Sequence, residues 1–305
     1  MTKSEIFSQV VQEQKNDRLV KILESKNNLR NLYFLDGVLP LVNKLGELKI
    51  EKAKLSISGC LTTNIDQEIK QTKINLIKLL KEYNVDTSKL SPNFNCKHCK
   101  DLGFVNDKLC DCLKTKYINR LLSYSETNLN EYPVLDKINT KVYSNEVEIK
   151  NLIKILQSNF NQQAKNTILL SGQTGTGKSF IAKSLLKTYI VNDNFGLYIP
   201  CFNLNNELLT YHTNFDKNKN LDKFLNPDIL VIDDLGTENI YKNVTLEYLL
   251  HILNERQEAN KLTVFSTNLT LLDIKARYTE RFFSRLIDKN QSLIFNLIGK
   301  DLRLK

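Results

Sequence analysis

A glycine-rich octapeptide is the segment of this 305-residue chain best suited to chemistry. It fits the pattern G-x-x-x-x-G-K-[ST], and its residues are Gly172, Gln173, Thr174, Gly175, Thr176, Gly177, Lys178 and Ser179. A strand-like run at 167–171 enters it and an apolar-periodic helical pattern leaves it. Glycines permit backbone turns that aim several N–H groups at one anion, and the dipole of the next helix adds positive potential there. The segment therefore predicts a phosphate-binding loop.

Within such a loop, particular side chains have defined chemistry. We expect Lys178 to reach the β- and γ-phosphates of a nucleotide and the Ser179 hydroxyl to ligate Mg²⁺. Asp233 and Asp234 end the apolar run 229–232, at the sheet edge where open α/β folds bind ligands. Asp233 is the expected Mg²⁺ partner through water, and Asp234 is a candidate to polarise the attacking water. Asp233-x-x-Gly236 also fits a GTPase pattern, but the sequence holds no Asn-Lys-x-Asp run, so we favour ATP.

Two weaker signals follow along the chain. Asn268 ends a Ser-Thr-Asn segment after the run 262–266, where an amide could orient water, although Asn is also a common turn residue. Arg277, Arg281 and Arg285 recur at i, i+4 and i+8, which predicts one helix with all three on one face. That stripe is either a solvated basic face or the source of an arginine that reaches a neighbouring subunit's nucleotide.

Four of the six cysteines form two close pairs. They are Cys96, Cys99, Cys110 and Cys112, spaced C-x-x-C, ten residues, then C-x-C. Two such knuckles can place four thiolates tetrahedrally around Zn²⁺. A redox pair, coincidental thiols, or His98 in place of one cysteine remain alternatives.

Composition sets broader limits. The formal charge is +9, and +7 of it lies in residues 1–120, which weakly favours a polyanionic partner such as nucleic acid. No apolar run is long enough to cross a bilayer, and the charged start shows no secretory pattern. We therefore expect a cytoplasmic protein without membrane contact, whose cysteines are reduced or metal-bound.

The surrounding pattern predicts the elements that position these residues. Residues 1–90 carry apolar positions at helical spacing, 91–114 form the cysteine-rich segment, 115–147 a helix and polar linker, and 148–305 an alternating strand–helix region. Short apolar runs at 167–171, 197–200, 229–232, 262–266 and 292–296 predict five strands. Alternation with helices makes this an α/β fold whose parallel sheet is covered on both faces.

Taken together, the motifs resemble those of AAA+ ATPases, and within them the bacterial replicative helicase loaders of the DnaC/DnaI type. The resemblance covers about residues 165–305 and includes GQTGTGKS, ILVIDDLGTE, LNERQEANKLTVFSTNL, RYTERFFSRL and FNLIGKDLR. It implies a sheet of order 5-1-4-3-2 and assembly into a spiral. It also implies that Asn268 is sensor I, Arg285 the trans-acting arginine finger, and Arg303 sensor II. The usual Walker B Asp-Glu is Asp233-Asp234 here, which makes slow, switch-like hydrolysis the expectation.

The cysteine segment is similar to the N-terminal region of many such loaders, in which that region grips the helicase and the ATPase domain binds single-stranded DNA. The resemblance thus implies an ATP-dependent loader of the hexameric replicative helicase that self-associates through its AAA+ domains, with ATP, Mg²⁺ and Zn²⁺ as cofactors. Three alternatives stay open: a transposition helper ATPase of the IstB type, a nucleotide-binding zinc adaptor with little turnover, and a small-molecule P-loop kinase, against which the motif order argues.

Overall fold

The computed structural model describes residues 2–58, 61–162, 164–213 and 221–304. Contacts divide the chain into two units, which we treat separately. The first unit comprises Met1–Val10 and Lys114–Lys305, and the second comprises Val11–Leu113.

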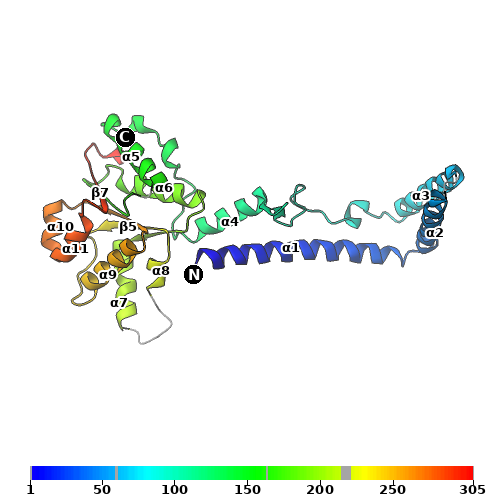
Figure 1. Ribbon diagram of the computed structural model, residues 1–305, viewed down its shortest axis with the longest axis horizontal. Coiled ribbons are helices and arrows are strands. Elements are labelled where there is room, and N and C mark those ends of the chain that lie inside the picture. The colour runs from blue at the N-terminus through cyan, green and yellow to red at the C-terminus, as the bar shows by residue number, and fades with distance from the viewer. Residues whose placement is uncertain (1, 59–60, 163, 214–220, 305) are drawn as a thin grey trace. The chain divides into compact units, whose positions relative to one another are not determined.

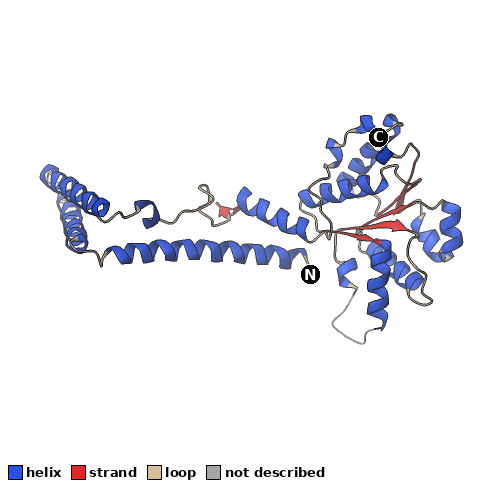
Figure 2. Cartoon of the chain, turned by 180° about the vertical axis from the view of Figure 1, so that it is seen from behind, coloured by secondary structure: helices blue, strands red, loops and turns tan. Residues whose placement is uncertain are grey.

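A five-stranded parallel sheet organises the first unit (Figures 1 and 2). Its strands are β3 (Thr167–Gly172), β4 (Gly196–Pro200), β5 (Ile229–Leu235), β6 (Leu262–Thr267) and β7 (Ser292–Leu297). The spatial order is β4-β5-β6-β3-β7, which corresponds to 5-1-4-3-2 when the strands are counted from β3. The α/β prediction is thereby confirmed, and each of the five apolar runs forms a strand of this sheet.

Helices cover both faces of the sheet (Figure 2). The helices of this unit include α4 (Asp111–Ser123), most of which belongs to it. They also include α5 (Glu146–Gln162), α6 (Lys178–Val191), α7 (Cys201–Thr213), α8 (Asp222–Leu225), α9 (Thr245–Glu258), α10 (Leu271–Arg277) and α11 (Glu280–Leu286). β3, β5 and β6 are almost entirely buried, whereas the edge strand β7 exposes some of its side chains. Side chains such as Leu169, Ile232 and Phe265 join the core that α7, α9 and α11 pack against. This core holds the carboxyl ends of the strands at one edge, where the expected site residues lie.

Residues 124–145, where the sequence suggested a polar linker, pack against α6 instead. They contain two short 3₁₀-helices, η2 (Leu135–Lys137) and η3 (Thr140–Val142). The Leu135 amide donates to Thr188 Oγ1 at 2.9 Å, and the Tyr132 ring lies 5.7 Å from the Phe180 ring. Leu135 is buried with its neighbours Leu129 and Ile138, so apolar residues scattered in a polar segment are enough to seat it on the outer face of a helix.

The expected arginine stripe is wrong, because the three arginines do not share one helix. α10 ends at Arg277, and Thr279 caps a separate helix by accepting a hydrogen bond from the Phe282 amide at 3.2 Å. Arg281 and Arg285 are exposed on α11, whereas Arg277 donates to the backbone oxygen of Glu238. A threonine N-cap is a strong helix start, and here it overrides the i, i+4, i+8 pattern.

The second unit is mainly helical. Its elements are α1 (Lys3–Leu32), of which residues from 11 onward belong here, α2 (Val38–Ile57), α3 (Thr63–Glu82), the 3₁₀-helix η1 (Thr87–Leu90) and a small antiparallel pair, β1 (Phe104–Val105) with β2 (Lys108–Leu109). α2 and α3 pack through Leu45, Leu48 and Ile69. Among the described residues, no helix combines the length and apolar character that crossing a membrane requires.

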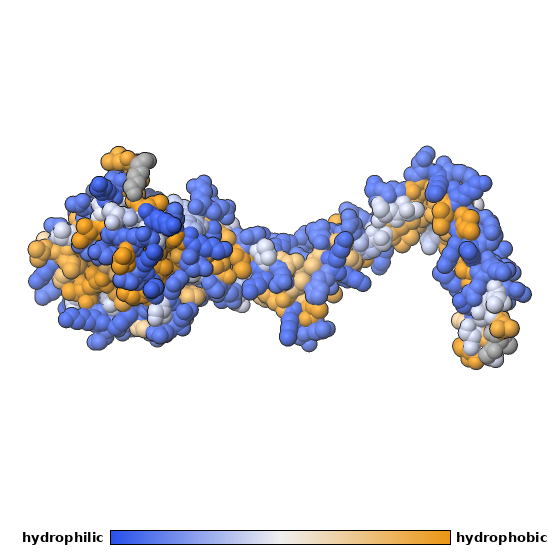
Figure 3. Space-filling model, turned by 90° about the horizontal axis from the view of Figure 1, so that it is seen from above, coloured by the Kyte–Doolittle hydropathy of each residue, from blue (hydrophilic) through white to orange (hydrophobic). Residues whose placement is uncertain are grey.

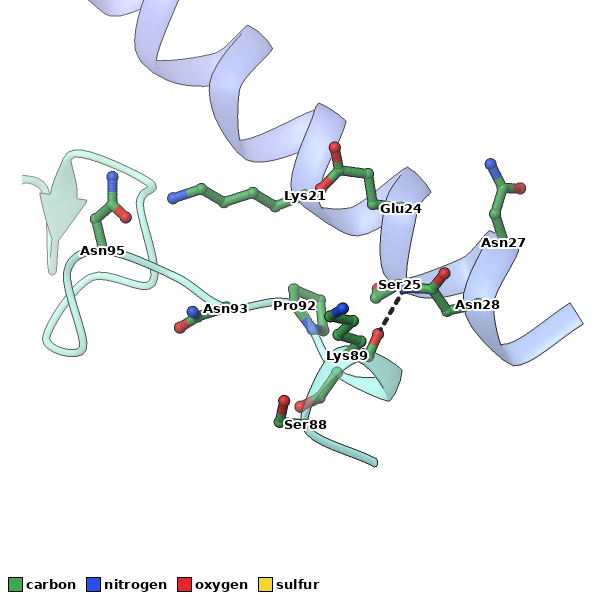
Figure 4. Close-up of a pocket in the computed structure, with 11 residues that line it drawn as sticks. Lys21, Glu24, Ser25, Asn27, Asn28, Ser88, Lys89, Pro92, Asn93 and Asn95 are labelled. Carbon is green, nitrogen blue, oxygen red and sulfur yellow. Dashed lines mark hydrogen bonds between the residues drawn. The ribbon is translucent and has the colours of Figure 1, made fainter. Parts of the chain in front are cut away.

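The segment from η1 to the cysteines runs beside α1. Asn28 Nδ2 donates to the Lys89 carbonyl at 3.1 Å, as Figure 4 shows, and Arg18 Nε donates to the Lys100 carbonyl at 3.0 Å. A hollow of about 890 Å³ lies between them. Amide, hydroxyl and ammonium side chains line it, together with the Glu24 carboxylate and Pro92. The residues expected to bind phosphate line a different cavity.

Candidate nucleotide site and cysteine cluster

A cavity of about 670 Å³ in the first unit collects most of the expected nucleotide-binding residues. It lies where the loop between β3 and α6 meets the end of β5 and the residues after β7. Its lining includes the predicted residues Thr174, Gly175, Gly177, Lys178, Ser179, Asp234, Asn268 and Arg303. Residues separated by more than a hundred positions in the sequence therefore meet at one sheet edge.

Two loop glycines have conformations that the cavity requires. Gly175 and Gly177 have φ angles of 79° and 92°, a region that other residues rarely adopt. A Cβ on Gly177 would lie 2.8 Å from the Tyr143 hydroxyl, and one on Gly175 would collide with the Asp301 carboxylate. The backbone can therefore turn toward the cavity only because both positions lack a side chain.

Lys178, the first residue of α6, is buried beneath the loop. Its Nζ donates to the carbonyls of Gly172 and Gln173 at 2.8 and 2.7 Å. Burial lowers the pKa of Lys178, while the nearby carboxylates of Asp234 and Asp233 oppose that shift. Both hydrogen-bond acceptors are neutral, so the ammonium charge is available to an anion in the cavity, as a phosphate-binding lysine requires.

Three hydroxyl groups hold the Asp233 carboxylate in one orientation. Ser179 Oγ donates to Asp233 Oδ1 at 2.9 Å, and Ser266 Oγ donates to the same oxygen. Tyr198 OH donates to Oδ2 at 2.6 Å. Oxygen ligands of this kind suit Mg²⁺, so Ser179 and Asp233 would hold that ion, which neutralises phosphate charge when bound.

Asp234 points into the cavity from a strained turn. Its φ is 55°, and its amide donates to Ser266 Oγ at 3.0 Å. Burial, and then repulsion from Asp233, raise the pKa of the Asp234 carboxyl, while attraction to Lys178 and Arg303 opposes the rise. A carboxylate with a raised pKa is a stronger proton acceptor, which suits a group that polarises water.

The other expected residues divide into two groups. Asn268 and Arg303 line the cavity, and Arg303 forms a two-bond ion pair with Asp301 at 3.1 and 3.0 Å. Arg285 is exposed on α11 and is not part of the cavity lining. Arg285 is thus placed apart from the nucleotide cavity of its own chain.

Several residues of this site were not found by sequence reasoning. Tyr132 and Tyr143 line the cavity, and Tyr198 fixes Asp233. Lys183 Nζ lies 4.6 Å from the centroid of the Tyr198 ring and 5.0 Å from that of Tyr132, a cation–π arrangement. The only signal available was the place of Tyr198 near the end of a predicted strand, because the tyrosines match no local motif.

The four predicted cysteines of the second unit lie together. Their Sγ atoms are all within 4.8 Å of one another, with 3.8 Å between Cys96 and Cys110 and 3.4 Å between Cys99 and Cys112. Four sulfurs around a tetrahedral Zn²⁺, with Zn–S bonds of about 2.3 Å, would lie roughly 3.8 Å apart. The arrangement therefore fits zinc, and His98 is exposed and outside the group.

Backbone amides and one buried carboxylate support this cluster. The Gly103 amide donates to Cys99 Sγ at 3.3 Å. Asp101 accepts from the Cys96 amide at 2.7 Å and from Lys21 Nζ at 2.7 Å. A hydrogen bond from the Cys99 backbone lowers the pKa of Cys96 to about 7, and burial raises the pKa of Cys112. Such outer contacts orient metal ligands in proteins.

Comparisons with known proteins identify the family of this chain. The model of the family of IstB-like ATP binding proteins matches residues 114–295. The chain is also similar to solved structures of the DnaC helicase loader, with 22% identity over 57% of this chain and 98% of that one and a TM-score of 0.43, and of DnaI, with 19% identity over 57% and 92% and a TM-score of 0.46. A third is DnaA from Aquifex aeolicus bound to AMPPCP, with 16% identity over 59% and 54% and a TM-score of 0.47. None of the curated proteins compared with the chain matches it.

The family match covers more than half of the chain and includes the phosphate loop, both acidic residues of β5 and Asn268. It confirms the AAA+ resemblance and, with it, ATP binding and ATPase activity. This chain is a member of the IstB-like ATP-binding protein family.

Proposed function

We propose that this ATPase loads a hexameric replicative DNA helicase onto single-stranded DNA during the initiation of replication. The observation that carries the proposal is the joining, in one chain, of a Walker-type site to a separate unit with a four-thiol cluster and exposed apolar helices. A chain built in this way uses nucleotide to arrange other macromolecules. The similar DnaC protein is a helicase loader, which illustrates such a role.

The ATPase unit supplies the switch in this proposal. Lys178 and the loop amides bind phosphate, Asp233 and Ser179 hold Mg²⁺, and Asp234 polarises water while Asn268 and Arg303 face the same cavity. We assign Arg285 to the nucleotide of a neighbouring copy, because it is exposed and outside its own cavity. Only a bound γ-phosphate would then stabilise the contact between copies, so hydrolysis would weaken the assembly.

The second unit supplies the grip on the helicase. Apolar side chains remain exposed along α2 and α3, among them Ile50 (60%), Ile57 (88%) and Ile77 (53%). Figure 3 shows apolar surface over this helix pair, among hydrophilic side chains. Exposed apolar surface of this kind marks protein interaction sites. Zn²⁺ at the four cysteines would stabilise the same unit, since the helix pair buries few side chains of its own.

The remaining features fit a DNA-associated protein of the cytoplasm. Most of the net positive charge lies in residues 1–120, which favours attraction to single-stranded DNA during delivery of the helicase. The cluster needs reduced thiols, which the cytoplasm maintains.

The rival from the same family is a transposition helper ATPase. It shares the ATPase unit, and the family name itself is that of IstB-like proteins. We favour the loader because of the cysteine cluster, since this segment is similar to the N-terminal region of many such loaders. A zinc adaptor that only binds nucleotide is the second rival, and Asp234 in place of glutamate is the feature that favours it.

A helicase capture and loading assay tests the proposal. The full chain is mixed with the organism's replicative helicase and circular single-stranded DNA, with ATP or ADP, and DNA-bound helicase is measured. We expect ATP-dependent loading that Lys178→Ala abolishes, whereas Lys154→Ala, at an exposed position of α5, leaves it unchanged. Capture of a transposase instead of the helicase would establish the helper. Loading unaffected by Lys178→Ala, without ATP turnover, would establish the adaptor.

A further inference from the structure

Glu238 is a buried carboxylate that follows the Walker B aspartates and is not among the residues that line the nucleotide cavity. Its side chain is fully buried, and the Arg277 guanidinium Nε lies 3.5 Å from its Oε1. Its Oε2 accepts a hydrogen bond from the Gly236 amide at 2.8 Å, and Oε1 accepts one from Tyr278 OH. This carboxylate therefore contacts both the Gly236 turn and the Arg277–Tyr278 segment, besides the buried Cys201 thiol of α7. A buried charge is kept only where such partners compensate it.

The first segment is the turn that carries Asp234. Thr237 donates to the Asp234 carbonyl from its amide at 3.2 Å and from its hydroxyl at 2.8 Å. Asp234 and Gly236 both have positive φ angles, 55° and 108°. These hydrogen bonds and backbone angles restrain the turn at both ends. A displacement of the Asp234 side chain by a ligand in the cavity would therefore also shift the Gly236 amide, which donates a hydrogen bond to Glu238.

The second segment is the junction between α10 and α11. Arg277 is the last residue of α10, Tyr278 follows it, and α11 begins at Glu280. The Tyr278 ring lies 5.1 Å from the ring of Phe282 on α11, and Phe282 in turn lies 6.0 Å from Phe265 on β6. Tyr278 is thus the contact through which Glu238 holds the helix that bears Arg285.

We infer that Glu238 is a positioning residue that links the Asp234 turn to α11 and so sets the placement of Arg285. Through this link, nucleotide contact at Asp234 in one copy adjusts the arginine that the copy presents to its neighbour. The inference rests on the proposed role of Arg285 in the neighbour's site. It goes beyond that role, because it makes the finger of each copy depend on that copy's own nucleotide turn.

A mixing experiment separates this role from simple stabilisation. Arg285→Ala chains keep a complete nucleotide site but have no finger. Asp233→Asn chains keep the finger, the phosphate loop and the Asp234 turn, but lack the carboxylate that would hold Mg²⁺. ATP turnover in the mixture then requires the nucleotide site of an Arg285→Ala chain and the Arg285 side chain of an Asp233→Asn chain. Glu238→Gln keeps side-chain size and one acceptor oxygen, and Tyr278→Phe keeps the ring that packs on Phe282.

The two substitutions are placed in one partner at a time. When either substitution is in the finger-donating chain, we expect ATP turnover of the mixture to fall about fivefold or more, the size of a typical coupling between two sites. When it is in the site-donating chain, we expect turnover to fall less than about twofold. Tyr248→Phe, whose hydroxyl contacts His212 elsewhere, serves as the control and leaves turnover unchanged. A loss that is equal in both placements, or larger in the site-donating chain, overturns the inference.

A second measurement does not depend on the neighbouring copy. We expect amide hydrogen exchange of residues 280–286 in the unmixed full chain to be faster in Glu238→Gln and Tyr278→Phe than in the parent chain. Unchanged exchange in both folded variants overturns the link and leaves the proposed function intact. If the reference mixture without these substitutions shows no restored turnover, the role of Arg285 fails and the inference fails with it.

Discussion

The residues that line the nucleotide cavity come from positions between 132 and 303, whereas the four thiols of the cysteine cluster lie between positions 96 and 112. The cavity exists only because a buried parallel sheet brings distant strand ends to one edge. The cluster is built by two turns of a single segment and needs no such core. A local site of this kind would be stabilised by a bound metal, and a distributed site by the packing beneath it.

Removal of the metal is the strongest test of this comparison. We expect Cys99→Ser to lower bound zinc from about one per chain to nearly none and to unfold the second unit, since structural zinc contributes roughly 10 kcal/mol or more in small domains. ATP binding by the first unit should persist. Elemental analysis, circular dichroism and nucleotide binding measure the three quantities. Loss of ATP binding in parallel would show that the two sites are not independent.

Arg285→Ala tests whether the distributed site extends beyond one chain. We expect ATP affinity to stay nearly unchanged and turnover to fall by about a thousandfold, the lower range for loss of an arginine finger. Steady-state turnover and nucleotide titration check this expectation. The control is Arg281→Ala on the same exposed helix, which should have little effect. Equal effects of the two substitutions would favour a general basic surface.

Tyr198→Phe sharpens the comparison within the cavity itself. The substitution removes the 2.6 Å hydrogen bond to Asp233 Oδ2 and leaves the ring beside Lys183. We expect turnover to fall about tenfold, since a hydrogen bond to a charged group contributes on the order of 1.5 kcal/mol. Nucleotide affinity measured with Mg²⁺ should weaken, and affinity measured without Mg²⁺ should not. A loss of similar size without Mg²⁺ would contradict the assignment of Tyr198 to the metal side of the site.

The smallest expected effect concerns the charge of Asp234. Burial is the main cause that raises the pKa of Asp234 in the folded protein. Above the pKa of the unfolded state, the ionised carboxylate therefore destabilises the folded protein. This destabilisation disappears as the pH falls through the raised pKa of the folded state. Asp234→Asn should therefore raise the melting temperature of the free protein slightly at pH 7, and less at pH 4. Asparagine tolerates the positive φ of this position. ATP turnover of the parent chain should decline on acidification, as Asp234 gains its proton.

Sequence reasoning succeeded where the signal was local. The phosphate loop, the five strands and the cysteine spacing each occupy a short stretch whose residue types have few structural solutions. It failed for the arginines, where a helical repeat was interrupted by the Thr279 cap, and for Tyr132 and Tyr143, which reach the cavity from a segment that looked like a linker.

The amino-acid sequence alone determined the nucleotide loop, the acidic pair near the end of β5, the α/β architecture and the thiol set. Only the tertiary structure decided that Tyr198 holds Asp233, that Glu238 bonds to both Gly236 and Tyr278, and that Arg285 stays outside its own cavity. The physical reason is the distance along the chain over which each interaction acts. Backbone geometry and metal ligation act over a few residues, whereas these contacts depend on how a buried sheet places strand ends and helices that are far apart along the chain.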